Sequence, residues 1–212
     1  IIMRRKDVIG IAQTGTGKTA AFTLPMLAIL DNIKPKAPGI RALIISPTRE
    51  LVAQIRDNII DYSLHLNVKL ATIYGGVGEQ PQIQALQNGA EIVIATPGRL
   101  MDLMEQGHID MRGLEILVMD EADRMLDMGF LPAMRKIVKK MPNDRQTLLF
   151  SATLSGQIEQ LTREFQQKPS TVEIGDRTNP AKTVRQCVYE IPRHLKFPLL
   201  LHLFKSPELY TV

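Results

Sequence analysis

The chain has 212 residues, of which 44% are hydrophobic and 23% are charged, as in ordinary globular proteins. That length suffices for one well-buried α/β domain, and the composition argues against a disordered chain. No apolar run reaches the roughly 20 residues that a membrane-spanning helix needs, and the N-terminal sequence lacks the layout of a signal peptide. We therefore expect a soluble protein that does not enter a membrane.

The net charge is +4 and the sequence pI is about 9.2, which is consistent with an anionic partner. The basic residues are not concentrated enough to indicate nucleic acid by themselves. Cys187 is the only cysteine, so no internal disulfide can form, and with ten methionines the composition suits a reducing compartment. We expect a cytoplasmic protein.

Six short apolar runs bounded by turn residues predict β-strands. They are residues 7–12, 41–46, 69–74, 91–96, 115–120 and 147–152. Apolar residues at helical spacing lie between most of these runs, for example Leu51, Ile55 and Ile59. Strands that alternate with helices predict an α/β fold with a doubly wound parallel sheet, which binds ligands outside the carboxyl ends of its strands. The sequences that follow the six runs are QTGTGKT, PTRE, GG, TPGR, DEAD and SAT, and we expect them to converge on one edge.

The sequence AQTGTGKT lies between a predicted strand and a predicted helix, the context that a phosphate-binding loop requires. Its first residue is Ala12, where the strict pattern has glycine. Gly15 and Gly17 permit backbone conformations that let consecutive N–H groups face phosphate oxygens. Lys18 would neutralise the β and γ phosphates, and Thr19 would offer its hydroxyl to Mg²⁺. The alternative is a glycine turn that caps a helix.

In the sequence ILVMDEAD, three carboxylates directly follow a predicted buried strand. Their negative charges must be balanced by a cation or a partner, or be solvated by water. With MgATP on the loop, Asp120 is placed to hold the metal, and Glu121 is placed to orient or deprotonate the attacking water. Asp123 lies too far along to share the metal, and we expect it to accept hydrogen bonds from hydroxyls such as those of Ser151 and Thr153. The alternative is a solvated helix N-terminus, where acidic residues are favourable.

These motifs and their order resemble the first RecA-like lobe of DEAD-box ATP-dependent RNA helicases of the bacterial type, over about residues 1–175. The matching sequences are AQTGTGKT, PTRELVAQ, GG, TPGRL, DEAD and SAT. The resemblance implies ATP and Mg²⁺ as cofactors, and implies catalytic roles for Lys18, Asp120 and Glu121. The implied metal ligands are Thr19 and Asp120. The implied nucleotide-binding residues are Ala12, Gln13, Thr14, Gly15, Thr16, Gly17, Lys18 and Thr19.

The resemblance also implies a track for single-stranded RNA, with single-stranded or duplex RNA as the partner. Its implied residues are Pro47, Thr48, Arg49, Gly75, Gly76, Thr96, Pro97, Gly98 and Arg99. Those implied to couple ATP to RNA are Asp123, Ser151, Ala152 and Thr153. Helix N-termini and glycine backbones can bind phosphates without reading bases, and Arg49 and Arg99 add positive charge. The alternative for PTRE and TPGR is helix capping by Thr48 and Thr96, which can coexist with phosphate binding.

We expect residues 1–175 to form the ATP-binding lobe, residues 176–183 a linker, and residues 184–212 the truncated start of a second lobe with exposed apolar side chains or disorder. The chain looks like a piece of a longer protein, and the family's adenine-recognising glutamine motif would precede Ile1. Without the arginine fingers of a second lobe, we expect this piece to hydrolyse ATP barely, since their loss costs on the order of 10³ to 10⁵ in rate.

Three functions are compatible with these residues. An RNA-dependent ATPase that unwinds short duplexes is favoured. A DNA translocase or repair helicase has the same architecture but is disfavoured by the forms AQTGTGKT, DEAD and SAT. An ATP-switched RNA clamp or scaffold would keep every residue named above, so the sequence does not separate it from an unwinding enzyme.

Overall fold

The structure is a computed structural model that describes residues 1–13, 15–35, 37–174 and 187–205. The chain divides into two compact units, Ile1–Gly175 and Asp176–Val212, and each is described by itself. Several predictions fall outside the described residues. They concern Thr14 of the glycine loop, the linker at 176–183, and the parts of the second lobe at 184–186 and 206–212.

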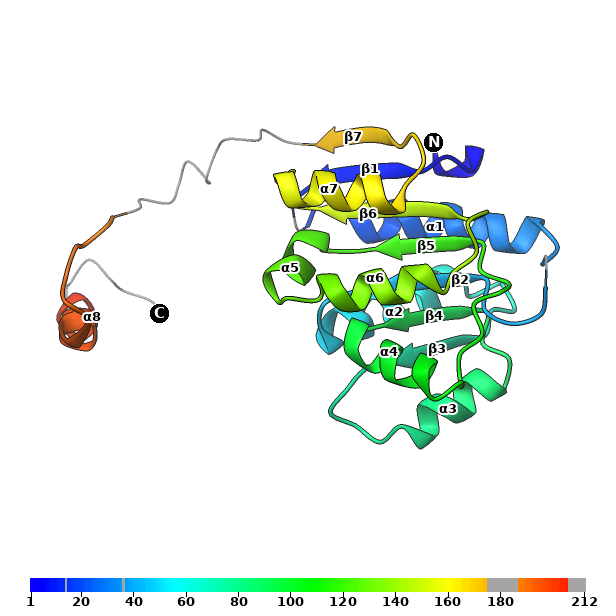
Figure 1. The fold of residues 1–212 in the computed structure, drawn as a ribbon, viewed down its shortest axis with the longest axis horizontal. Coiled ribbons are helices and arrows are strands. Elements are labelled where there is room, and N and C mark those ends of the chain that lie inside the picture. The colour runs from blue at the N-terminus through cyan, green and yellow to red at the C-terminus, as the bar shows by residue number, and fades with distance from the viewer. Residues whose placement is uncertain (14, 36, 175–186, 206–212) are drawn as a thin grey trace. The chain divides into compact units, whose positions relative to one another are not determined.

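The first unit is built on one sheet of seven parallel strands in the order β3-β4-β2-β5-β6-β1-β7 (Figure 1). The strands are β1 (Val8–Ala12), β2 (Ala42–Ile45), β3 (Leu70–Ile73), β4 (Ile92–Ala95), β5 (Ile116–Met119), β6 (Gln146–Ser151) and β7 (Ser170–Ile174). The six predicted strands all form, within one residue at each end. Because every pairing is parallel, the carboxyl ends of all the strands lie along the same side of the sheet, named here the carboxyl-terminal edge.

The seventh strand, β7, is not predicted from the sequence. It pairs with β1 alone at the edge of the sheet, and its residues Val172 and Ile174 are 36% and 57% exposed. An exposed edge strand needs only alternating apolar residues, so STVEI contains no continuous apolar run to detect.

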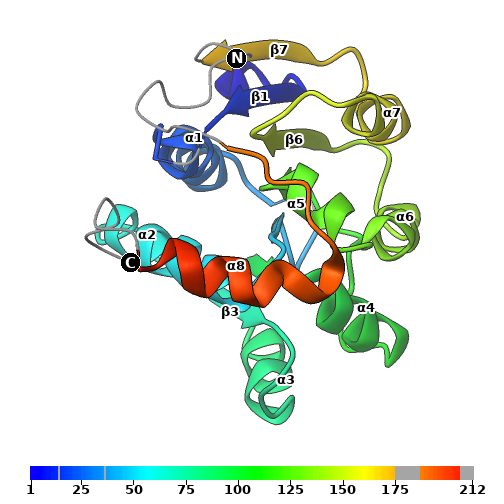
Figure 2. The same ribbon diagram turned by 90° about the vertical axis from the view of Figure 1, so that its left-hand side faces the viewer.

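Helices cover both faces of the sheet, which confirms the doubly wound α/β fold. In the first unit they are η1 (Ile2–Arg4), α1 (Lys18–Asn32), α2 (Arg49–Tyr62), α3 (Gln80–Gln87), α4 (Pro97–Glu105), α5 (Ala122–Asp127), α6 (Leu131–Lys139) and α7 (Gly156–Phe165). Figure 2 views the sheet from its carboxyl-terminal edge, with α1 and α2 on one side and α4, α6 and α7 on the other. The sheet is therefore the middle of three layers.

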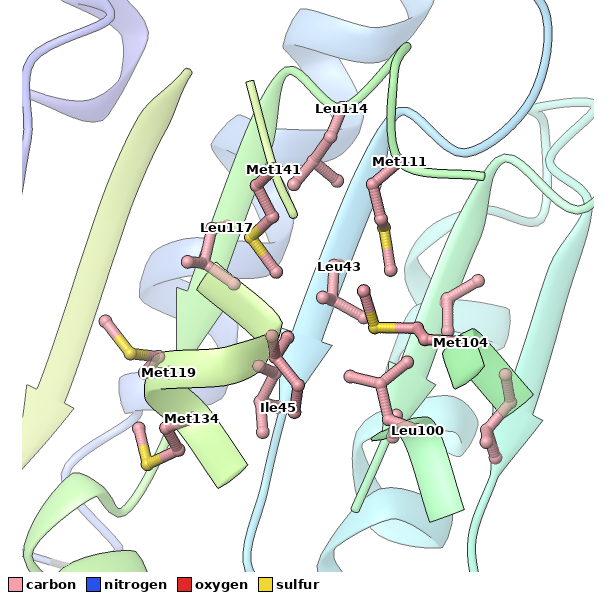
Figure 3. Close-up of a cluster of buried hydrophobic side chains, with 14 of the residues drawn as sticks. Leu43, Ile45, Leu100, Met104, Met111, Leu114, Leu117, Met119, Met134 and Met141 are labelled. Atoms are coloured by element: carbon pink, nitrogen blue, oxygen red, sulfur yellow. The ribbon is translucent and has the colours of Figure 1, made fainter. Parts of the chain in front are cut away.

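Alternate residues of the central strands pack into two separate cores. In β2, Leu43 and Ile45 belong to the core beneath α4 to α7, whereas Ala42 and Ile44 belong to the core beneath α1 and α2. All four side chains are completely buried. Figure 3 shows Leu43 and Ile45 among leucine and methionine side chains from neighbouring strands and helices. Burial on both faces explains why these strands read as continuous apolar runs.

A buried ion pair joins elements at the amino-terminal ends of the strands. Arg41 Nε donates to Glu115 Oε1 at 2.7 Å, and the two residues are 3% and 0% exposed. Arg41 also donates to the backbone carbonyls of Leu30 at 2.7 Å and Ile33 at 2.6 Å. A second guanidinium, that of Arg5, lies 3.5 Å from the Glu115 carboxylate. The pair thus connects the end of α1 to β2 and β5.

The described part of the second unit, residues 187–205, contains η2 (Arg193–Leu195) and α8 (Lys196–Leu203). No residue of α8 is buried, and Phe197, Leu200 and Leu201 are 67%, 45% and 47% exposed. The expected exposed apolar patch is present here. Across the described ranges of both units, every helix is too short or too polar to cross a bilayer.

We predict that Glu115→Gln lowers the free energy of unfolding by about 3 kcal/mol, because it leaves the Arg41 charge buried without its anion. Asp110→Asn is the matched control: it breaks the exposed pair between Asp110 and Arg112, so the urea midpoint should hardly move. Urea denaturation followed by circular dichroism measures both variants. Equal midpoints for the two would contradict a stabilising role for the buried pair.

Candidate functional site at the carboxyl-terminal edge

The strand order sorts the six motifs into two groups along one edge of the sheet (Figure 2). GG, TPGR and PTRE follow β3, β4 and β2, which are neighbours. SAT and AQTGTGKT follow β6 and β1, which also pair with each other although they lie far apart in the chain. DEAD follows β5, between the two groups. The predicted RNA-binding and nucleotide-binding residues thus occupy adjacent halves of the edge.

The glycine loop leads directly into α1. Gly15 and Gly17 have φ angles of +83° and +85°, a conformation that strains residues with a Cβ. A Cβ added at either position would meet nothing within 4 Å, so the backbone angle rather than space requires glycine. Thr16 Oγ1 donates to the carbonyl of Gln13 at 2.7 Å and closes the loop. No side chain caps α1, which leaves its first N–H groups suited to an anion.

An apolar cavity of about 190 Å³ adjoins this loop. Thr16 and Lys18 line it on the loop side, and Phe150, Val172 and Ile174 line it on the sheet side. An apolar wall beside a few polar groups is the usual character of a small-molecule site. A phosphate-bearing ligand on the loop would therefore have an uncharged surface next to it.

Asp120 directly follows β5 and is only 5% exposed. Burial raises the pKa of its carboxyl from 3.8 to about 6, although the nearby Lys18 charge opposes the rise. Its Oδ1 accepts a hydrogen bond from the backbone N–H of Glu121 at 3.0 Å. This carboxyl is thus held in a place where its charge is poorly solvated, as is common at functional sites.

Glu121 has a φ angle of +52°, in the left-handed region that residues with a side chain seldom adopt. Its carboxylate accepts a hydrogen bond from Arg124 Nη1 at 3.2 Å. Sequence reasoning did not single out Arg124, although an acid and a base three residues apart at a helix start are a recognisable pair. Backbone strain of this kind concentrates at functional residues.

Asp123 links the ends of β5 and β6. Its Oδ2 accepts hydrogen bonds from the backbone N–H groups of Ala152 and Thr153, both at 3.1 Å, and from Thr153 Oγ1 at 3.2 Å. The expected hydrogen bond from the Thr153 hydroxyl is present. The expected one from Ser151 is not, because its hydroxyl donates instead to the Thr153 carbonyl at 2.8 Å, within the turn.

The predicted RNA-binding residues of PTRE and TPGR begin two helices. Thr48 caps α2 by accepting a hydrogen bond from the Leu51 N–H at 3.4 Å, so the capping interpretation holds for this residue. Thr96 stands at the same position of α4, but its side chain accepts no capping hydrogen bond. Pro47 and Pro97 are buried, which places them under the helix starts rather than at the surface.

Arg49, Gly76 and Arg99 come together from three different elements. Gly76 has a φ angle of +83°, and a Cβ added there would lie 3.7 Å from Arg49 Nη1. Arg49 Nε also donates to the exposed Glu50 carboxylate at 2.8 Å. Arg99 Nη1 donates to the carbonyl of Val77 at 3.3 Å. Two guanidinium groups therefore flank Gly75 and Gly76, which the family resemblance assigned to the same RNA track.

The predicted oxygen ligands next to the glycine loop suit Mg²⁺ better than a metal ion that is coordinated by protein side chains alone. Among the described residues, no group of three or more His, Cys, Asp or Glu side chains could hold a metal ion. The predicted ligands are one hydroxyl, of Thr19, and one carboxylate, of Asp120. Mg²⁺ commonly takes one or two protein oxygens and completes its shell with phosphate oxygens and water.

Comparison with known proteins gives consistent matches. The family model of the DEAD/DEAH box helicases matches residues 1–161. The rice DEAD-box ATP-dependent RNA helicase 45 is 46% identical over 208 residues, which cover 96% of this chain and 22% of that protein. The DEAD-box ATP-dependent RNA helicase CshA of Streptococcus pneumoniae is 41% identical over 214 residues, which cover 100% of this chain and 40% of that protein.

Solved structures agree with the sequence matches. The yeast DEAD-box splicing factor Prp28 superposes with a TM-score of 0.77 at 36% identity, over 82% of this chain and 42% of that one. A DEAD box protein from Methanococcus jannaschii gives a TM-score of 0.76 at 33% identity, over 97% of this chain and 54% of that one. The chain therefore spans only part of the proteins that it matches.

We predict that Asp120→Asn stabilises the protein in the absence of nucleotide and divalent cations, and does so more at neutral than at acidic pH. The folded-state pKa of about 6 lies above the ordinary 3.8, so ionising Asp120 makes folding less favourable as pH rises between these values. The gain of the variant between about pH 4 and pH 7.5 should be about 2 to 3 kcal/mol. Denaturant titrations at the two pH values measure it, and a gain independent of pH would contradict the burial argument.

Proposed function

The chain belongs to the DEAD/DEAH box helicase family, and we propose that it is the ATP-binding lobe of an ATP-dependent RNA helicase. RNA would stimulate its ATP hydrolysis, which would drive local duplex unwinding or remodelling of RNA–protein complexes. The observation that carries this proposal is that both groups of motifs lie at one edge, with Asp123 of DEAD, between them, hydrogen-bonded to the SAT residues after β6. The names of its relatives support RNA rather than DNA as the substrate.

We propose that residues 12–19 bind the phosphates of ATP. The left-handed glycines and the uncapped start of α1 supply N–H donors, and Lys18 supplies positive charge. Thr19 and Asp120 would hold Mg²⁺, which supplies charge neutralisation for the phosphates when it is bound. A cation beside Asp120 would also favour the ionised carboxylate that burial disfavours.

Glu121 is the proposed residue that orients or deprotonates the attacking water. Its hydrogen bond from Arg124 fixes the carboxylate without burying it, since the Glu121 side chain is 15% exposed. The strained backbone at Glu121 turns the chain sharply between the end of β5 and the start of α5.

The proposed RNA track comprises the starts of α2 and α4 and the glycine pair at Gly75 and Gly76. N–H groups at helix starts bind phosphates without reading bases, so such contacts suit RNA of any sequence. Arg49 and Arg99 add charge beside the glycine pair. Thr96, which makes no capping hydrogen bond, has a hydroxyl suited to a phosphate or a 2′-hydroxyl.

Coupling between the two halves is proposed to pass through Asp123. It lies two residues after Glu121 on the same turn into α5, and it accepts three hydrogen bonds from Ala152 and Thr153 after β6. A shift of the turn after β6 would therefore move α5 and with it Glu121. Ser151 contributes by bonding within that turn.

We further propose that residues 1–175 form the RecA-like ATP-binding lobe, that residues 176–183 are a linker, and that residues 184–212 are the truncated start of a second lobe. The exposed apolar side chains of α8 support the last assignment, because they require a covering surface. The matched proteins extend well beyond this chain, so the partner of the first lobe would lie in the rest of the protein. An exposed free thiol at Cys187 supports a reducing, cytoplasmic location.

The test of function is steady-state ATP hydrolysis by the whole protein with no nucleic acid, with single-stranded RNA and with DNA of the same sequence. We predict stimulation by RNA alone. Glu121→Gln should lower the stimulated rate by about 10² to 10⁴, as expected for loss of a general base. Glu159→Gln, on the exposed surface of α7, is the matched control and should leave the rate unchanged.

The alternatives give different outcomes in the same assay. Equal stimulation by DNA would make the protein a general nucleic-acid translocase with the ATP site intact. An absence of stimulation, together with RNA retention under a non-hydrolysable nucleotide, would indicate a clamp or scaffold. Full activity of Glu121→Gln would overturn the assignment of that carboxylate.

A graded pair of substitutions tests the coupling. Asp123→Ala removes the acceptor of three hydrogen bonds and should reduce the ratio of RNA-stimulated to basal rate by about tenfold, whereas Thr153→Val removes only one of them and should have a smaller effect. ATP affinity, measured with a fluorescent nucleotide, should stay unchanged in both. An equal loss in the two variants, or a parallel loss of ATP affinity, would contradict the proposed role.

A further inference from the structure

A buried glutamine holds the turn that carries the glycine pair. Gln82 lies in the first turn of α3 and is 7% exposed. Its Oε1 accepts a hydrogen bond from the backbone N–H of Tyr74 at 3.1 Å. Its Nε2 donates to the carbonyls of Tyr74 and Gly78, each at 3.1 Å. One side chain thus ties both ends of the segment from residue 74 to residue 78, named here the 74–78 loop.

Only a carboxamide of this length satisfies all three contacts. It offers one acceptor and two donors, which match one N–H and two carbonyl groups. A carboxylate would keep the contact with the Tyr74 N–H but would face the two carbonyl oxygens without a proton. An apolar side chain of equal size would remove this partner from all three backbone groups.

The 74–78 loop is held from a second side by α4. Arg99 Nη1 donates to the carbonyl of Val77 at 3.3 Å, between the two residues that Gln82 binds. Gly76, at the middle of the loop, has a φ angle of +83° that glycine alone adopts without strain. Gln82 from α3 and Arg99 from α4 therefore both hold the loop in the observed conformation.

The same shape leaves donors available for a ligand. Within the described residues, the backbone N–H groups of Gly75 and Gly76 donate to no other backbone carbonyl. Arg49 lies beside Gly76, so positive charge adjoins these N–H groups. A phosphate oxygen near the loop could thus accept from a backbone donor and interact with a guanidinium at once.

We propose that Gln82 is a positioning residue for RNA binding: it fixes the 74–78 loop so that the N–H groups of Gly75 and Gly76 meet the RNA backbone. This inference rests on the proposed RNA-binding function of the same edge. Gln82 itself is buried and touches no RNA. Its loss raises the entropy cost of ordering the loop on binding, and so weakens RNA binding without altering the ATP site.

The chain offers a matched control in Gln166. It is equally buried, at 7% exposed, and its Nε2 donates to the carbonyls of Val8 and Thr147, both at 2.8 Å. Those carbonyls lie at the amino-terminal ends of β1 and β6, at the opposite edge of the sheet from the 74–78 loop. Replacing Gln166 by methionine therefore perturbs stability in a similar way but leaves the loop intact.

The experiment compares Gln82→Met and Gln166→Met in the whole protein. Three quantities are measured: the RNA concentration that gives half-maximal ATPase stimulation, the turnover at saturating RNA, and amide hydrogen exchange of residues 74–78 without RNA. For Gln82→Met we expect about a tenfold rise in the half-maximal RNA concentration, unchanged turnover and faster exchange in the loop, as loss of one or two net hydrogen bonds implies. For Gln166→Met all three quantities should stay near those of the unsubstituted protein.

The outcomes separate this inference from the function on which it rests. If RNA does not stimulate the unsubstituted protein, the proposed function fails, whatever Gln82 does. If RNA stimulates it but Gln82→Met needs no more RNA than Gln166→Met, Gln82 does not position the loop for RNA. If Gln82→Met does not fold, Gln82→Glu replaces it in the test, because the carboxylate retains the contact with the Tyr74 N–H but loses both contacts with carbonyl groups. The same rise in the half-maximal RNA concentration is expected. No rise in this variant would overturn the proposal.

Discussion

Burial of the sheet on both faces is the constraint on which the rest of this structure depends. The central strands contribute completely buried side chains to two cores, so neither face of these strands offers a place for charged groups. Chemistry is confined to the two ends of the strands. At the amino-terminal end the charges of Arg41 and Glu115 neutralise each other, while at the carboxyl-terminal end Asp120 is buried without such a direct partner. One end stabilises the fold, and the other leaves a buried carboxyl group at the proposed metal site.

The sequence predicted most of the fold because strands buried on both sides are short continuous apolar runs, which their length and the turn residues on either side distinguish from helices. The same physics explains the strand that was missed, since β7 lies at the edge and four of its five residues are exposed. The convergence of the motifs also followed from sequence, because parallel strands share one carboxyl-terminal edge. Their division into two groups did not, since strand order depends on which neighbours pair across the whole chain.

Side-chain hydrogen bonds were less accessible to sequence reasoning. The contact between Asp123 and Thr153 was predicted, but the Ser151 hydroxyl turned to a carbonyl of its own turn. Gln82 was missed altogether because its partners are backbone groups, which carry no signal in the residue type. The pair of Arg41 and Glu115 was missed for a related reason: they are the first residues of two predicted strands that lie 74 residues apart, so only the folded sheet brings them together.

The pairing of β7 has a consequence for the cavity beside the glycine loop. Ile174 is opposite Ala12 in the register between β7 and β1, so the chain leaves the sheet beside the glycine loop. Val172 and Ile174 also line the apolar cavity next to that loop. The pairing of β7 with β1 therefore forms one wall of this cavity, so a substitution that weakens the pairing would change the space beside the loop.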